Sequence, residues 1–250
     1  MANFISLCLT IYLWTVTAIA TIVSFVVCLL FYPFISERTF GYLYTKVFGD
    51  MIMYSMTIPR FWTLKITDLR DPADQNFKNQ YIIISNHASF IDTLVASRIP
   101  LVKKFIMAKE FMSVPVFGWL CRSSGHIPVC SRDRKSITSA IDLSVKAMDD
   151  GSSFMIYPEG KRSKNPNEVL PFKTGAFRLA RRTGVPILPI IIKGTGKAMP
   201  IGGFCYPAKM ELIIGKPFNV SNDYEDIRED PVFTESYQFI QSHLSKTLIL

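Results

Sequence analysis

The sequence predicts an α/β fold in which a mixed, largely parallel sheet is flanked by helices and preceded by an N-terminal membrane-associated helical segment. Three observations predict it. Residues 1–36 contain no charged side chain. After residue 60, short apolar runs alternate with helical patterns of about 10–15 residues, as in sheets that carry helices on their faces. Several of these apolar runs end in polar turns, which is where such sheets bind ligands. The 250 residues are enough for one full domain.

The first element is the uncharged N-terminal stretch. Its apolar part, FISLCLTIYLWTVTAIATIVSFVVCLLFYPF, is longer than the roughly 20 residues that a membrane-spanning helix needs. A signal peptide is the alternative interpretation. However, the stretch lacks a basic start and a small-residue cleavage site, and its apolar run is too long for a signal sequence. We therefore expect a membrane segment that the protein retains.

The next stretch, FGYLYTKVFGDMIMYSMTIPRFW, is also apolar. Two interpretations remain open for it: a second membrane helix that folds back on the first or lies in the interface, and a core helix of the following domain. Lysine and arginine occur only after residue 37, so the positive-inside rule places the larger C-terminal part in the cytosol. We expect a membrane-embedded segment over residues 1–60 and an α/β domain over residues 61–250.

Hydrophobic periodicity predicts the elements of that domain. FWTLKIT alternates apolar Trp62, Leu64 and Ile66 with polar residues, which is typical of a half-exposed strand. Short apolar runs predict further strands at residues 81–85, 104–108, 126–130, 153–157, 186–193 and 209–215. Predicted helices cover residues 136–151, 175–184 and 232–250, and the first two of these end in glycine.

The formal net charge of +8 is concentrated in two regions, residues 98–135 and residues 161–182. On a membrane protein, such regions favour anionic lipid headgroups or a phosphorylated substrate. Nucleic acid is the rival partner, but no basic stripe with interleaved aromatic residues is present, so we expect no nucleic acid. The five cysteines have no paired spacing, and no His/Cys cluster has metal-ligand spacing. We expect free thiols and no metal.

The most informative stretch is YIIISNHASFIDTL, residues 81–94, in which Asp92 follows His87 by five residues. Five residues of regular helix correspond to about 500° of rotation, so the two side chains can meet only if the chain turns between them. A carboxylate can fix the tautomer of a histidine and stabilise its protonated form, which makes the histidine a general base. The alternative is a helix cap formed by Asn86 or Ser89, with His87 as an ordinary surface histidine.

Three other turns gather basic residues. SRDRKS supplies Arg132 and Arg134, and arginine binds phosphate oxygens bidentately. Lys173 opens the helix that GAFRLARRTG predicts. YPEGKRS follows a predicted strand and places four residues at its end, with a glycine that lets backbone approach a ligand: Glu159, Gly160, Lys161 and Arg162. An ordinary charged turn is the alternative for YPEGKRS.

Taken together, NHASFID, YPEGKRS, FKTGAF and VPILPI resemble the four motifs of the 1-acylglycerol-3-phosphate acyltransferases, in the glycerolipid acyltransferase superfamily. The resemblance covers roughly residues 75–217. Two positions depart from the family pattern. Lys161 stands where the family has threonine, and Ser131 stands where the family has a basic residue, six positions after Gly125. Two residues, Arg132 and Arg134, are therefore candidates for the phosphate contact that the basic residue makes in the family.

The resemblance implies a membrane-bound enzyme that moves an acyl group from a thioester to the sn-2 hydroxyl of 1-acylglycerol 3-phosphate, giving phosphatidic acid. It implies that His87 removes the hydroxyl proton, that Asp92 orients His87, and that no acyl-enzyme forms. No cofactor is expected; the acyl donor is carried by coenzyme A or by acyl carrier protein. The partners are the lysophospholipid, the thioester and the membrane. The implied substrate-binding residues are Arg132, Arg134, Glu159, Gly160, Lys161, Arg162 and Lys173.

Two alternatives remain open. In one, the acceptor is glycerol 3-phosphate or another lysophospholipid, because the core motifs are shared among these enzymes. In the other, which belongs to a different functional class, the chain is a membrane lipid-binding protein without turnover. His87 and Asp92 favour an enzyme, since a binding protein has no need of a base at this spacing.

Overall fold

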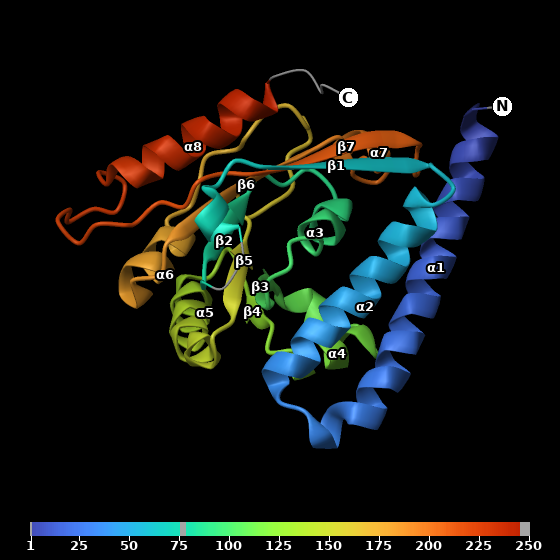
Figure 1. Cartoon of the computed structure of the whole chain (residues 1–250), viewed down its shortest axis with the longest axis horizontal. Coiled ribbons are helices and arrows are strands. Elements are labelled where there is room, and N and C mark those ends of the chain that lie inside the picture. The colour runs from blue at the N-terminus through green and yellow to red at the C-terminus, as the bar shows by residue number, and fades with distance from the viewer. Residues whose placement is uncertain (1, 76–78, 246–250) are drawn as a thin grey trace.

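The computed structural model describes residues 2–75 and 79–245. Within them, seven strands form one sheet in the order β1-β7-β6-β2-β5-β3-β4 (Figure 1). All neighbouring strands are parallel except β6 and β7, which are antiparallel. This confirms the predicted mixed, largely parallel sheet. The strands are β1 Trp62–Asp68, β2 Ile82–Ser85, β3 Lys103–Ala108, β4 Ile127–Val129, β5 Ser153–Ile156, β6 Ile187–Lys193 and β7 Ala208–Ile214.

Helices cover both faces of the sheet. Short 3-10 turns lie at Tyr32–Phe34, Pro72–Asp74, Lys109–Ser113 and Met148–Asp150. The α-helices are α1 Ala2–Phe31, α2 Glu37–Thr57, α3 Ile91–Ala96, α4 Phe117–Ser123, α5 Arg134–Ala147, α6 Gly175–Thr183, α7 Thr195–Ala198 and α8 Pro231–Leu244. The last predicted helix thus ends earlier than expected among the described residues, and its final part, 246–250, lies outside them.

The two faces of the sheet carry separate hydrophobic cores. On β2, Ile83 packs into the core formed with α1, α2, α3 and α4, whereas Ile82 and Ile84 pack into the core formed with α5, α6 and α8. This alternation follows from the two-residue period of a strand, and burial on both faces explains why the run is apolar throughout. The strand β1 differs because it lies at the edge of the sheet. Trp62 is fully buried there, but Ile66 is 49% exposed, so the predicted alternation holds only for the first half of the strand.

The N-terminal helices pack against the sheet domain. Helices α1 and α2 run side by side along one side of the molecule (Figure 1). Eight residues of α2 are buried, and all of them except Gly41 and Gly49 share one core with the sheet and with Leu9 and Leu13 of α1. Of the two interpretations of this stretch, a core helix agrees with that packing. The expected division of the chain at residue 60 stays a prediction, but a single core extends across it.

One helix among the described residues is long and apolar enough to cross a membrane, Phe4–Phe31, which is 22% buried in its most apolar window. Its outward face carries large exposed side chains such as Phe4, Ile11 and Leu30. A helix of this composition needs an apolar environment for that face.

Candidate active site

Asn86 directly follows β2, and its side chain forms the hydrogen bonds to β6 that a backbone residue of the strand would form. Asn86 is buried, and its side-chain amide donates to the Ile192 carbonyl at 2.8 Å, while its carbonyl oxygen accepts from the Ile192 N–H at 2.9 Å. The side chain thus ties the β2 turn to β6 after Ser85, the last residue of the strand. An asparagine suits this position because it offers a donor and an acceptor at once. The next residue, His87, is therefore held at the carboxyl end of the sheet.

His87 and Asp92 meet across the turn. The His87 Nδ1 and Asp92 Oδ2 atoms are 2.8 Å apart, and the Asp92 side chain is fully buried. The same oxygen accepts the N–H groups of Ala88 and Ser89 at 2.7 and 2.8 Å, and Oδ1 accepts the Thr195 hydroxyl. Donors surround the carboxylate on every side, which compensates its burial. The carboxylate therefore accepts from Nδ1–H, and Nε2 of His87 is left with the lone pair that a base requires.

Glu159 connects the second motif to His87. Its Oε1 accepts the His87 N–H at 2.7 Å, and its Oε2 accepts the Leu170 N–H at 2.9 Å. The Ser163 N–H also donates to the His87 carbonyl at 2.7 Å. Burial raises the pKa of Glu159 to about 7, although the two N–H donors oppose that increase. Glu159 is only 3% exposed, so its carboxylate positions the loop and the His87 backbone instead of pointing toward solvent.

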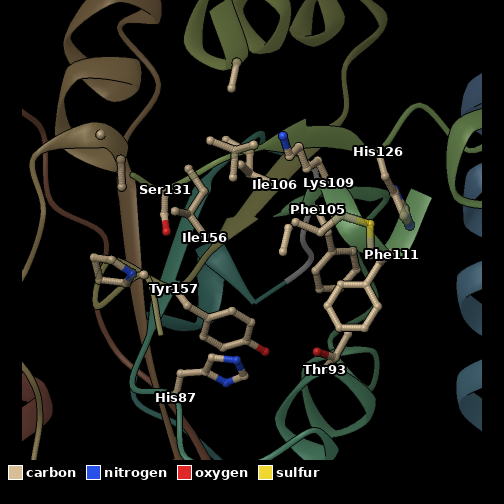
Figure 2. Close-up of a pocket in the computed structure, with 18 of the residues that line it drawn as sticks. His87, Thr93, Phe105, Ile106, Lys109, Phe111, His126, Ser131, Ile156 and Tyr157 are labelled. Atoms are coloured by element: carbon tan, nitrogen blue, oxygen red, sulfur yellow. The ribbon is translucent and has the colours of Figure 1, made fainter. Parts of the chain in front are cut away.

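Tyr157 forms one wall beside the histidine. The rings of Tyr157 and His87 stack with centroids 3.9 Å apart and planes inclined by 15° (Figure 2). The tyrosine directly follows β5, as His87 follows the end of β2. Because β5 is the parallel neighbour of β2, the two residues lie at the same edge of the sheet. Stacking fixes the plane of the imidazole, while Asp92 fixes its rotation within that plane. Tyr157 was not among the predicted site residues, although it ends the predicted strand over residues 153–157 and begins YPEGKRS, which was the available signal.

Lys173 bridges two of the basic turns. Its ammonium lies 3.4 Å from the Ser131 carbonyl, and its backbone N–H donates to the Pro158 carbonyl at 2.8 Å. Gly160 has a φ of +67°, and a Cβ added there would come within 2.8 Å of the Lys173 Nζ atom. Only glycine allows the backbone to turn in this conformation and lets the lysine pass so closely. The loop after β4 and the loop after β5 are thereby held together.

His87, Tyr157, Gly160 and Lys173 border one cleft of about 1180 Å³. The predicted residues His87, Arg132, Arg134, Gly160, Lys161, Arg162 and Lys173 line it. Asp92 and Glu159 lie behind His87, where they hold it in place. Within the described residues, the structure therefore brings NHASFID, YPEGKRS, FKTGAF and the SRDRKS turn together near the carboxyl ends of β2, β5 and β4, where α/β sheets bind ligands. The fourth motif, VPILPI, lies largely in β6 and does not line the cleft.

The cleft extends onto both faces of the sheet, and we name its two parts. The α2 side is lined by Tyr44, Thr45, Phe48, Leu94, Phe105 and Phe117. The α5 side is lined by Ile106, Ile137, Ile141, Ile156, Gly175 and Arg178. Figure 2 places Phe105 and Phe111 apart from Ile106 and Ile156 around the His87–Tyr157 pair. Both parts offer apolar walls that lead to the histidine. Sequence analysis gave no signal for most of these residues, because they belong to ordinary core faces of helices and strands.

Comparison with known proteins places these observations in a family. The family model described as Acyltransferase matches residues 65–193, a span that contains every one of the predicted site residues. A 1-acyl-sn-glycerol-3-phosphate acyltransferase from Salmonella typhimurium is 32% identical over 183 residues, which are 71% of each chain. Chloroplastic enzymes of the same name from Brassica napus and Arabidopsis thaliana are each 31% identical, over 81% and 77% of this chain. The chain spans 58% and 52% of the length of those two plant relatives.

The fold has a solved counterpart. The crystal structure of the 1-acyl-sn-glycerophosphate acyltransferase PlsC from Thermotoga maritima matches with a TM-score of 0.79 at 21% identity and covers 98% of this chain and 96% of that one. At this identity the match supports the fold alone, including the two N-terminal helices. With the family model over half of the sequence and the identity to the bacterial relative, the chain belongs to the acyltransferase family.

Proposed function

We propose that the protein transfers an acyl group from a thioester to the sn-2 hydroxyl of 1-acylglycerol 3-phosphate and so produces phosphatidic acid. One observation carries the proposal: His87 is held through Nδ1 by a buried carboxylate and lines a cleft that has both apolar walls and a basic rim. A base, an apolar channel and phosphate-binding side chains are what an acyl thioester and a phosphorylated alcohol require together. The names of the relatives agree with acyl transfer to this acceptor.

His87 acts as the general base in the proposed reaction. Its Nε2 takes the proton of the acceptor hydroxyl as the oxygen attacks the thioester carbonyl. The new ester C–O bond forms, the C–S bond breaks, and the thiolate leaves with the proton that Nε2 returns. Asp92 stabilises the imidazolium that exists between these two proton transfers. A positioned base contributes about 10²–10⁴ in rate, and holding two substrates together contributes further.

The acceptor phosphate is proposed to bind among Arg132, Arg134 and Lys173. All three line the cleft, and the ammonium of Lys173 is fixed between two loops. Lys161 and Arg162 add exposed positive charge beside it. In this proposal Gly160 gives Lys173 its room, and Glu159 acts on the His87 backbone rather than on the substrate. Arg132→Ala and Arg134→Ala separate the two candidates, since the acceptor KM increases for the true phosphate ligand.

Membrane association is part of the proposal, because both lysophospholipid and product reside in a bilayer. Helix α1 contacts the domain near both of its ends: Thr10 accepts the Cys205 N–H at 2.7 Å, and the Phe25 and Trp119 rings are 5.2 Å apart. An upright crossing would carry the sheet domain into the hydrocarbon, where its loops would lose their water. We therefore propose that α1 lies within one leaflet and that the domain stays on the cytosolic side.

A thiol-release assay with purified protein in detergent or bilayers tests the proposal. Acyl-CoA and 1-acylglycerol 3-phosphate should yield free thiol and phosphatidic acid, and His87→Ala should abolish both without unfolding the protein. Glycerol 3-phosphate and other lysophospholipids in the same assay test the alternative acceptors. A folded protein that binds these lipids without any thiol release would instead support the lipid-binding alternative and refute the enzyme.

A further inference from the structure

The α5 side of the cleft has a feature that the proposed acceptor site does not use. One face of α5 borders the cleft, with residues spaced at i, i+3, i+4 and i+7, and the start of α6 borders it from the opposite wall. The inner part of this side is apolar, and arginines stand at its outer end. The α5 residues are Arg134, Ile137, Thr138 and Ile141, and the α6 segment contributes Thr174, Gly175 and Arg178.

Gly175 keeps this side open. A Cβ added at Gly175 would meet no atom within 4 Å, although the residue belongs to a helix and lines the cleft. The α2 side is different at its corresponding glycine, because a Cβ added at Gly49 would come within 2.3 Å of the Ser97 Oγ atom. The cleft therefore has room beside Gly175, between α5 and the start of α6, and this space is the passage; at Gly49 the backbone of α2 instead packs closely against Ser97.

The outer end of the passage is cationic. Arg178 and Arg228 both line the cleft, and both lie close to the carboxylate of Asp226, which accepts from the Arg228 guanidinium at 3.2 Å. Two guanidinium groups, those of Arg178 and Arg228, thus share this one carboxylate. Arg228 comes from a segment whose sequence is mainly acidic, which is why sequence analysis did not connect it with the cleft.

We propose that the α5 side binds the phosphopantetheine arm of the acyl donor, with Arg178 and Arg228 holding its phosphate. The inference rests on the proposed acyl transfer and specifies where the donor enters. A phosphopantetheine thioester is a narrow chain with a phosphate at one end and the reacting carbonyl at the other, which matches a passage from a cationic rim to His87. Coenzyme A and acyl carrier protein share this arm, so the geometry applies to both.

Electrostatics favours two separate phosphate sites. Donor and acceptor must be bound at the same time, and each brings negative charge to the cleft. Placing both phosphates in one cluster would make them repel each other at short distance in a partly dry site. Arg178 and Arg228 on the far side of Gly175 allow the donor phosphate to bind away from Lys173, which is proposed to serve the acceptor. The apolar α2 side then remains for the acyl chain.

Steady-state kinetics with three donors tests the proposal: acyl-CoA, acyl carrier protein thioester, and the acyl thioester of N-acetylcysteamine, which lacks phosphate. The variants are Arg178→Ala and Arg228→Ala. Arg182→Ala is the matched control, because this arginine lies on the same helix but pairs with Asp142 outside the cleft. We expect the KM for acyl-CoA to increase about tenfold in each cleft variant, the loss typical of one charge-assisted contact. The KM for the acceptor and for the N-acetylcysteamine thioester should stay unchanged.

The donor panel also identifies the source of the phosphate. An increase with both natural donors assigns the contact to the shared arm and supports the proposal, whereas an increase with acyl-CoA alone assigns it to the nucleotide phosphates and overturns it. Gly175→Leu should lower kcat/KM for all three donors by filling the passage. The proposal is overturned if the cleft variants raise the acceptor KM instead, or if the N-acetylcysteamine thioester suffers as much as acyl-CoA. Absence of thiol release from every donor in the unmodified protein would refute the proposed function itself.

Discussion

The carboxylate of Glu159 accepts the backbone N–H of His87 at 2.7 Å, so a residue of the second motif holds the main chain of the first. Removing that carboxylate with Glu159→Ala leaves the buried N–H groups of His87 and Leu170 without acceptors. Each unsatisfied buried donor costs about 1–3 kcal/mol. We expect Glu159→Ala to lower both the free energy of unfolding and kcat, with little effect on the acceptor KM. Denaturant unfolding and steady-state kinetics measure these quantities; a selective KM effect would instead place Glu159 against the substrate.

The same residue predicts a pH dependence of stability. Burial raises the pKa of folded Glu159 from 4.5 to about 7, so the folded state holds a proton that the unfolded state has lost between these pH values. Its contribution to stability is therefore complete below pH 4.5 and is lost as the pH rises through about 7. Glu159→Gln removes this titration. Relative to Glu159→Gln, the wild type should therefore have a lower free energy of unfolding at pH 8 than at pH 5. A difference between the two proteins that is the same at both pH values would contradict the raised pKa of Glu159.

The negative charge of Asp92 gives a third prediction. Asp92→Asn keeps the shape of the side chain, and its amide oxygen can still accept from Nδ1 and from the N–H groups of Ala88 and Ser89, but the variant loses the charge that stabilises the His87 imidazolium. We expect kcat to fall by at least 10²-fold, in the range for a lost general base. Thr195→Val is the control, because it removes one donor to Asp92 but leaves the contact with His87 in place. Similar losses in both variants would show that Asp92 acts only through loop structure.

The sequence predicted these local relationships better than the long-range ones. The spacing of His87 and Asp92 required a turn, and the strand before it was evident from YIIIS. The contact of Thr195 with Asp92 joins residues 103 positions apart, and no local pattern indicates it. Ile66 followed the alternating pattern but is exposed, because β1 lies at the edge of the sheet, a position set by its parallel pairing with β7, which is distant in the sequence. In both cases the structure depends on residues that are distant in the sequence and adjacent in the fold.

The basic residues of the cleft show the same limit of prediction from local sequence patterns. Lys173 was found because it opens a predicted helix, and Arg132 because it follows the predicted strand over residues 126–130. Arg178 belongs to the regular pattern of α6, and Arg228 lies in an acidic stretch, so neither has a local signal. Only the folded chain places them on the rim of the cleft that His87 lines.

Asn86 provides a fourth prediction, about stability. Its side chain makes two hydrogen bonds to Ile192 in a buried position. Asn86→Leu is similar in volume but leaves both backbone groups of Ile192 unpaired, so we expect a loss of about 2–4 kcal/mol in the free energy of unfolding. Activity should fall as well, since His87 follows directly. Urea unfolding monitored by circular dichroism measures the first effect, and unchanged stability would mean that water replaces the side chain.

Gly160 provides the last prediction, and Gly184 serves as its matched control. Both have a left-handed φ, +67° and +68°, so alanine strains the backbone equally at the two positions. They differ in surroundings: a Cβ at Gly160 would press on the Lys173 ammonium, whereas a Cβ at Gly184 would meet no atom within 4 Å. Gly160→Ala should raise the acceptor KM by displacing Lys173, and Gly184→Ala should lower stability by a similar amount without changing the KM. Equal kinetic effects in the two variants would mean that backbone strain alone is responsible and that Lys173 does not hold the acceptor phosphate.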